Sequence, residues 1–287
     1  MSADAREVGA RQLVGARLRQ LRLHANRTQK EAATAIEASI AKISQMENGR
    51  VPFRRRDLID LLMLYGVTDP YQQETIISVA LGKRDPDWWD SQDVPIEETV
   101  LWAHEQAATL IRTYQPHLVP DLLRTQEYAA AAHRASHYPA PSATATAATV
   151  KNVQRRQQAL SASLWVVIDE PVLWRPLGGD IAAHLRQLDA LTDASQTQGI
   201  TIQVNPLSSP FLPACEPFTV FRFADRPQLL AIHRLTGDEI SALRDAERYG
   251  MVFEELIAVA AASRSTPQII ARIRDHLHET AADHSGP

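Results

Sequence analysis

Histidines, paired acids and one cysteine are the residues of this chain that could take part in metal or acid–base chemistry. Ten histidines and a lone cysteine, Cys215, occur among its 287 residues. His133 and His137 are spaced to share a helix face, but a zinc site needs three or four ligands and the sequence places no third. Asp169 and Glu170 end an expected strand, where carboxylates can act as acids or bases, although capping and ion pairing are commoner roles there.

No other stretch has the spacing of a catalytic or cofactor site. Gly178-Gly179 lacks the spacing of a phosphate loop. No His or Lys adjoins Cys215 in sequence, so we expect a packed thiol rather than a redox sensor. A single cysteine also excludes an internal disulfide and fits a reducing compartment. We therefore expect no enzyme activity, no cofactor and no metal.

Positive charge near the N-terminus offers a different chemistry, which is the neutralisation of a polyanion. Residues 6–56 contain ten Arg and two Lys against four Glu, although the whole chain has a net charge of −4. The remaining residues are therefore acidic. Such segregated charge is the electrostatic footprint of a domain that binds nucleic acid.

Two short helices are expected to position the basic segment. Thr28 and Glu31 form a capping box that starts the first helix. Ser39 offers a second N-cap, and Asn48-Gly49 ends the second helix. Helices joined in this way are typical of helix-turn-helix proteins, in which the N-terminal half of the second helix enters the major groove. The alternative, an ordinary helical hairpin with a solvated basic face, is disfavoured by the charge.

The second helix is expected to have one buried and one exposed face. Helical spacing places Ile43 and Met46 inward. The outward side chains in its N-terminal half are Ile40, Ala41, Lys42, Ser44 and Gln45.

Residues 28–50, TQKEAATAIEASIAKISQMENGR, resemble the helix-turn-helix of the phage-repressor (Xre-type) family. They meet the pattern T-Q-x-E-x-A-x-x-x-x-x-S-x-x-x-I-S-x-x-E-x-G almost throughout. Glu37 departs from it, because the family usually has a turn glycine there. A non-glycine residue with positive φ costs roughly 1 kcal/mol, so we expect a weakened turn.

The resemblance implies a role for each outward side chain. Gln29 would cap the recognition helix against a phosphate, while Ile40, Ala41 and Gln45 would face base edges, with Lys42 as a fourth candidate. A glutamine can read adenine with two hydrogen bonds, and the two apolar residues suit thymine methyl groups.

The resemblance also implies contacts to the DNA backbone. Asn48 and Arg50 would hold the backbone, and the run 54–56 would lie along phosphates or reach a minor groove. Arg22 would pair with Glu47, an architectural contact between the first and third helices. The full predicted DNA-binding set is Gln29, Ser39, Ile40, Ala41, Lys42, Ser44, Gln45, Asn48, Arg50, Arg54, Arg55 and Arg56.

The chain is long enough for two domains with separate cores. We predict a mostly α, five-helix helix-turn-helix domain over residues 1–83, with Asp69 as N-cap and Pro70 as first residue of the fifth helix. Residues 84–95 are expected to be a linker, in which Trp88-Trp89 serve as packing anchors.

Residues 96–287 are predicted to form an α+β domain with a small mixed sheet. Strands are expected at 164–169, 201–204, 218–223 and 229–233. Helices are expected at 97–114, 122–137, 142–161, 180–198, 238–262 and 267–279.

Residues 118–129 are similar to the V-P-G-L-L-Q-T-x-x-Y-A signature of the WhiJ-like regulators of actinobacteria. Supporting pieces occur in the same order at residues 65–70, 88–89, 156–157, 169–173 and 218–219. The resemblance implies a C-terminal domain of unresolved function, often encoded beside a small partner protein. Asp121 replaces Gly and Arg124 replaces Gln in the signature. If these positions line a pocket or an interface, the ligand or partner of this chain would differ.

These observations favour a transcriptional regulator that binds double-stranded DNA as a homodimer and senses a small-molecule effector or partner protein through residues 96–287. One alternative is an antitoxin-like protein that binds a small partner and autoregulates through DNA, and another is a DNA-targeted enzyme. The chain contains no apolar run of about 18 residues and its N-terminus lacks the apolar core of a signal peptide. We therefore expect a cytoplasmic protein with no membrane contact.

Overall fold

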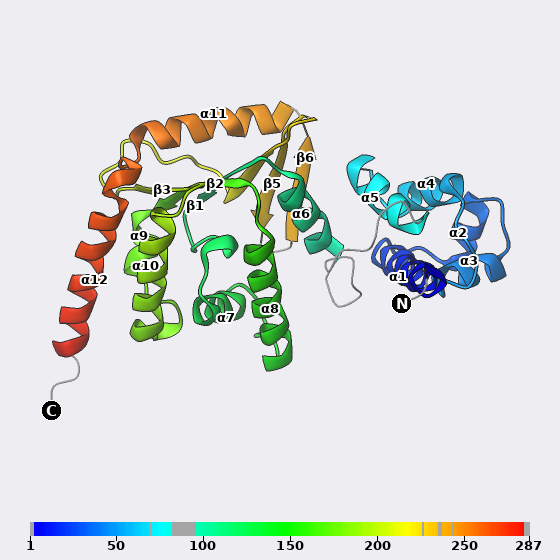
Figure 1. Cartoon of the computed structure of the whole chain (residues 1–287), viewed down its shortest axis with the longest axis horizontal. Helices are drawn as coiled ribbons and strands as arrows, with labels where there is room; N and C mark the ends of the chain where they lie inside the picture. Colours follow the sequence, from blue (N-terminus) through cyan, green and yellow to red (C-terminus); the bar gives the residue numbers. More distant parts are fainter. Residues whose placement is uncertain are drawn as a thin grey trace. The chain divides into compact units, whose positions relative to one another are not determined.

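The computed structural model describes residues 3–68, 70–81, 96–225, 227–234, 237–242 and 244–283 (Figure 1). The chain separates into two compact units, Met1–Ala103 and His104–Pro287, and each is described by itself. The predicted linker at 84–95, its two tryptophans and the predicted N-cap Asp69 lie outside the described residues. None of the described helices is long and apolar enough to cross a membrane.

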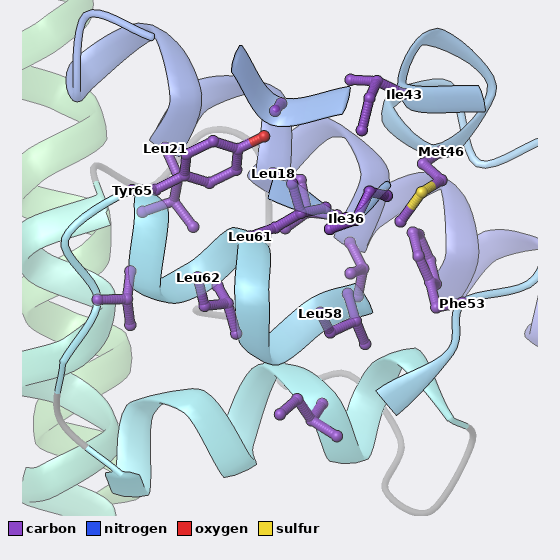
Figure 2. Packing of buried hydrophobic residues seen from close by; sticks show 14 of the residues in the cluster. Leu18, Leu21, Ile36, Ile43, Met46, Phe53, Leu58, Leu61, Leu62 and Tyr65 are labelled. Atoms are coloured by element: carbon purple, nitrogen blue, oxygen red, sulfur yellow. The ribbon is translucent and has the colours of Figure 1, made fainter. Parts of the chain in front are cut away.

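The first unit contains five helices within residues 3–81 as described. They are α1 (Ala3–His24), α2 (Gln29–Ala35), α3 (Ile40–Glu47), α4 (Arg55–Leu64) and α5 (Pro70–Ala80). Their apolar faces meet in one core, where Leu18, Ile43 and Leu58 are almost completely buried (Figure 2). The predicted mostly α fold of this part is confirmed.

The second unit is built on a mixed sheet with six described strands. They are β1 (Leu110–Gln115), β2 (Ser163–Asp169), β3 (Ile200–Asn205), β4 (Phe218–Arg222), β5 (Leu229–Arg234) and β6 (Gly237–Ala242), in the order β3-β2-β1-β4-β5-β6. β1, β2 and β3 are parallel, and β4, β5 and β6 continue the sheet in antiparallel pairs. The predicted α+β fold with a mixed sheet is confirmed.

Helices cover this sheet on both faces. α6 (Ile96–Ala107) crosses the division between the two units, and the described helices after it are α7 (Gln126–Ala135), α8 (Ala143–Ala159), α9 (Glu170–Trp174), α10 (Ile181–Ser195), α11 (Arg244–Val259) and α12 (Thr266–Asp283). Figure 1 shows α11 on one side of the strands and α7, α8 and α10 on the other. Phe253 and Leu256 of α11 pack on Tyr114, Phe218 and Leu230 of the sheet.

Two strands were not predicted. The helix expected at 97–114 ends at Ala107, and the residues after it form β1, the strand at the centre of the sheet. Arg112 interrupts the apolar pattern of β1, yet it is buried, because its guanidinium lies 5.5 Å from the Trp165 ring centroid and pairs with Glu254. The helix expected at 238–262 was also wrong at its start, where the polar strand β6 precedes α11.

Candidate nucleic-acid interface

Local caps set the limits of α2 and α3. The Thr28 hydroxyl accepts from the Glu31 amide at 3.2 Å, and the Glu31 carboxylate accepts from the Thr28 amide at 2.8 Å. Ser39 Oγ accepts from the Lys42 amide at 3.2 Å and so caps α3. Gly49 follows the C-cap with a φ of 66°. The capping box, the second N-cap and the glycine stop are all confirmed.

Glu37 adopts positive φ in the turn between α2 and α3. Its φ is 51°, and its side chain is exposed. The Ala38 amide donates to the Ala33 carbonyl at 2.8 Å, which closes the turn. The backbone conformation expected of the family's glycine is therefore present, with the side-chain strain that Glu37 adds.

A buried ion pair fixes α3 against α1. Arg22 donates to both carboxylate oxygens of Glu47, from Nε at 2.6 Å and from Nη2 at 3.1 Å. The hydrogen bond to Glu47 raises the pKa of Arg22 above its usual value, although burial opposes it. The Gln29 amide nitrogen donates to Glu47 at 2.9 Å, so the start of α2 is held to the end of α3 by the same carboxylate. The predicted architectural role of Arg22 is confirmed.

The two faces of α3 are arranged as predicted. Ile43 and Met46 are each 1% exposed, whereas Ile40 is 50% exposed. Ala41 and Gln45 are also exposed, and Ser44 is half-buried. Apolar side chains beside a glutamine suit the major groove of DNA, which presents thymine methyl groups and the hydrogen-bonding edge of adenine.

Lys42 differs from its neighbours on α3 because its ammonium is already paired. Its Nζ lies 2.6 Å from Asp57 Oδ2 of α4. The pair connects α3 to α4 and withdraws one positive charge from the exposed face.

The basic residues after α3 fall into two electrostatic groups. Arg50 and Arg54 are exposed, and no ion pair is present for either within the described part of the chain. Arg55 instead pairs with Glu74 of α5 through two contacts, at 3.1 and 2.5 Å, and Arg56 lies 3.8 Å from Asp60. The sequence predicts one cationic run at residues 54–56, whereas among the residues that the structure describes Arg55 and Arg56 lie beside acidic side chains and Arg54 does not. Asn48 turns back to donate to the Ser44 carbonyl at 2.7 Å.

The close approach of α1 to the end of α3 was not predicted. A Cβ at Gly15 would collide with the Met46 carbonyl oxygen and would lie 2.8 Å from that of Glu47. A Cβ at Gly49 would lie 2.6 Å from the backbone of Gln12. The available signal was a glycine inside an expected helix, which often marks such packing.

In the second unit, the two histidines with helical spacing lie at the end of α7. His137 lies beyond the end of α7 and its Nδ1 contacts the His133 carbonyl at 2.8 Å, with the two ring centroids 4.3 Å apart. No group of three potential metal ligands occurs within the described residues. Burial raises the pKa of Cys215, and Glu216 and Asp169 add to the effect, so the thiol stays protonated at neutral pH.

The two departures from the WhiJ-like signature contact each other. Asp121 forms an ion pair with Arg124, and its other oxygen accepts from Arg156 at 2.7 Å. Arg156, 5% exposed, also pairs with Glu105 of α6 through two contacts of 2.6 and 2.9 Å. The acid and the base that depart from the signature are therefore joined in one network.

Comparison with known families assigns both parts of the chain. Residues 99–272 match a family described as "Domain of unknown function (DUF5753)". The chain belongs to this family. In this DUF5753 protein, residues 13–73 match a second family, described as "Helix-turn-helix domain", and the match runs from the middle of α1 to the first part of α5. No curated protein matches the chain significantly. The helix-turn-helix match and the exposed face of α3 together indicate a DNA-binding regulator.

Proposed function

We propose that this DUF5753 protein is a sequence-specific transcriptional regulator of the Xre type, with the WhiJ-like architecture found in actinobacteria. Residues 1–83 bind operator DNA, residues 84–95 link the domains, and residues 96–287 dimerise and sense an effector or a partner protein. A protein that acts on chromosomal DNA in this way works in the cytoplasm.

The observation that carries the proposal is the surface of the recognition helix. The helix exposes Ile40 and Ala41 at its start and Gln45 one turn further on, and the exposed Arg50 and Arg54 follow in sequence. Base-reading side chains beside phosphate-binding cations are the arrangement that sequence-specific recognition needs. The Arg22–Glu47 pair and the caps of Thr28 and Ser39 are made within the protein, so the helix is positioned before DNA binds.

Gln45→Ala tests the proposal directly. The wild-type protein should select a symmetric site from random DNA, and the variant should lose preference at one position in each half-site. The preferred base should lose roughly 1–3 kcal/mol of discrimination, because a bidentate contact is removed. Gln126→Ala, an exposed glutamine on α7, is the matched control and should leave the selected site unchanged. An unaltered preference in Gln45→Ala would refute the assignment.

A further inference from the structure

Three polar residues lie at one edge of the sheet in the second unit. Tyr114 is near the end of β1, Asp169 is the last residue of β2, and Asn205 is the last residue of β3. These strands are parallel, and Asp169 stands opposite Asn205 in the register. In open sheets of this kind, ligands bind outside the carboxyl ends of parallel strands.

The buried carboxylate of Asp169 accepts two hydrogen bonds from neutral groups. Its Oδ2 accepts from the Tyr114 hydroxyl at 3.0 Å and its Oδ1 accepts from the Asn205 amide at 2.9 Å. All three residues are at least nine-tenths buried. Over the ranges that the structure describes, no Lys, Arg or His pairs with Asp169. Burying an unpaired carboxylate is costly, so a missing positive group is the simplest explanation.

The adjacent residue shows the usual solution. Glu170 is equally buried, and its carboxylate accepts from Arg272 at 3.2 Å, from the Trp174 indole at 3.2 Å and from the Leu207 amide at 3.0 Å. Its charge is therefore balanced by a cation and two further donors, whereas Asp169 receives neutral donors alone.

The side-chain oxygen of Asn205, beside Asp169, has unused hydrogen-bonding capacity. Asn205 Oδ1 is buried and accepts no hydrogen bond. Turning the amide over would remove the donor from Asp169, so the carboxylate fixes its orientation. Burial and the neighbouring carboxylate raise the pKa of Tyr114, so it remains a neutral phenol whose hydroxyl donates a hydrogen bond to Asp169. The cluster of Tyr114, Asp169 and Asn205 can therefore accept further hydrogen bonds, and a bound group must be a donor.

We propose that this edge binds a small organic molecule through its protonated amine. The ammonium group supplies the positive charge that is missing beside Asp169, and it donates N–H hydrogen bonds to Asp169 and to Asn205 Oδ1. Leu207 follows Asn205 by two residues and its amide is bonded to Glu170, the neighbour of Asp169, while its side chain is 71% exposed and can contact a short carbon chain on the amine. The inference rests on the proposed function, because it names the chemical class of the effector.

Isothermal titration calorimetry of the full-length protein with butylammonium chloride tests the site. Tetramethylammonium chloride is the control probe, since it carries the same charge but no N–H donor. Wild-type protein should bind butylammonium, and tetramethylammonium should bind roughly tenfold more weakly or not at all. No butylammonium binding, or equal binding of both probes, would show that water alone fills the cluster and would overturn the inference.

Variants locate the binding. Asp169→Asn and Asn205→Leu should each weaken butylammonium binding roughly tenfold or more, whereas Asp193→Asn, which removes an exposed carboxylate from α10, should stay within about twofold of wild type. Circular dichroism of each variant establishes that it is folded. If either buried variant fails to fold, the contrast between the two probes on wild-type protein still decides the question. Equal loss in Asp193→Asn would overturn the site.

Operator binding is measured separately, with and without butylammonium. Sequence-selective DNA binding without any amine binding would refute this inference and leave the DNA-binding part of the proposed function standing. Amine binding that leaves operator affinity unchanged would support the site and refute sensing through it.

Discussion

Arg54 and Arg55 are sequence neighbours in different electrostatic states. Arg54 is exposed and unpaired within the described residues, while Arg55 is held by both oxygens of Glu74. Arg54→Ala should lower the slope of log K against log salt by about 1, because one phosphate contact is lost. Arg55→Ala should lower it less, because Glu74 competes with phosphate for the guanidinium. Titrations of a non-specific duplex at several salt concentrations measure both, and equal slopes for the two variants would contradict the division.

A change next to Lys42 should strengthen DNA binding, whereas the changes at Arg54 and Arg55 should weaken it. Asp57→Asn removes the partner of Lys42, frees the ammonium for phosphate, and should increase affinity for all DNA sequences, with a salt slope steeper by about 1. Asp60→Asn makes the same change in net charge on the same helix, but its contact to Arg56 is long, at 3.8 Å. It should therefore raise affinity less. Identical gains in the two variants would indicate a general charge effect and no special role for the pair.

At the scale of elements, the contact between α1 and α3 permits no side chain at residue 15. Gly15→Ala should destabilise the helical unit by about 1–3 kcal/mol, because the new methyl group meets backbone that cannot move independently. Gly66→Ala is the matched change in open space, where only positive φ opposes the methyl group, at roughly 1 kcal/mol. Hydrogen exchange of amides in α1 and α3 should accelerate much more in Gly15→Ala. Unchanged protection there would mean that the helices can separate without loss.

Arg156 joins α6, α8 and the turn Asp121–Leu123 through two carboxylates. Arg156→Met should destabilise the second unit by about 3–5 kcal/mol, since Glu105 would be left buried and unpaired. Urea unfolding followed by tryptophan fluorescence measures this, with Arg186→Met, which breaks an exposed pair to Glu127, as a control of small effect. Comparable losses in the two variants would contradict the importance of burial.

The same network predicts that the folded second unit loses stability at low pH. Burial acts to raise the pKa of Asp121, but Arg124 and Arg156 outweigh it and hold the pKa below its usual range. A carboxylate with a depressed pKa stabilises the fold above its ordinary pKa near 4, and the stabilisation is lost as pH falls further. Wild-type protein should therefore lose stability below about pH 4 by more than Asp121→Asn does. Parallel pH profiles for the two proteins would exclude this contribution.

The features that the sequence predicts correctly are those formed between residues close together in the chain. The caps at Thr28 and Ser39 and the positive φ of Glu37 involve neighbouring residues, and all were predicted. The Lys42–Asp57 and Arg55–Glu74 pairs join different helices, 15 and 19 residues apart, and no local pattern shows them. β1 was missed for the same reason, because the environment that accommodates Arg112 comes from β2 and α11.

The net charges of the two parts of the chain have opposite signs, which suits them to different partners. Residues 84–287 contain 25 acids and 17 bases, so their surface repels DNA and is available for contacts between subunits. We expect the main dimer contact there, since one recognition helix reads few base pairs and operators pair half-sites about 34 Å apart. Full-length protein should be a dimer by light scattering, and residues 1–83 alone should be monomeric and bind weakly. A dimeric fragment, or a full-length monomer on and off DNA, would refute this arrangement.

The position of β1 in the sheet has a consequence for synthesis on the ribosome. Among the described strands β1 is the first to emerge, but its antiparallel partner β4 begins at residue 218, more than a hundred residues later. The helical unit, whose contacts are local, can fold while the rest is still being translated. One edge of β1 then stays open until β4 leaves the exit tunnel, and an open strand edge invites pairing with other chains. Nascent chains stalled before residue 218 should therefore bind general chaperones more strongly than chains that are long enough for β4 and β5 to have left the exit tunnel.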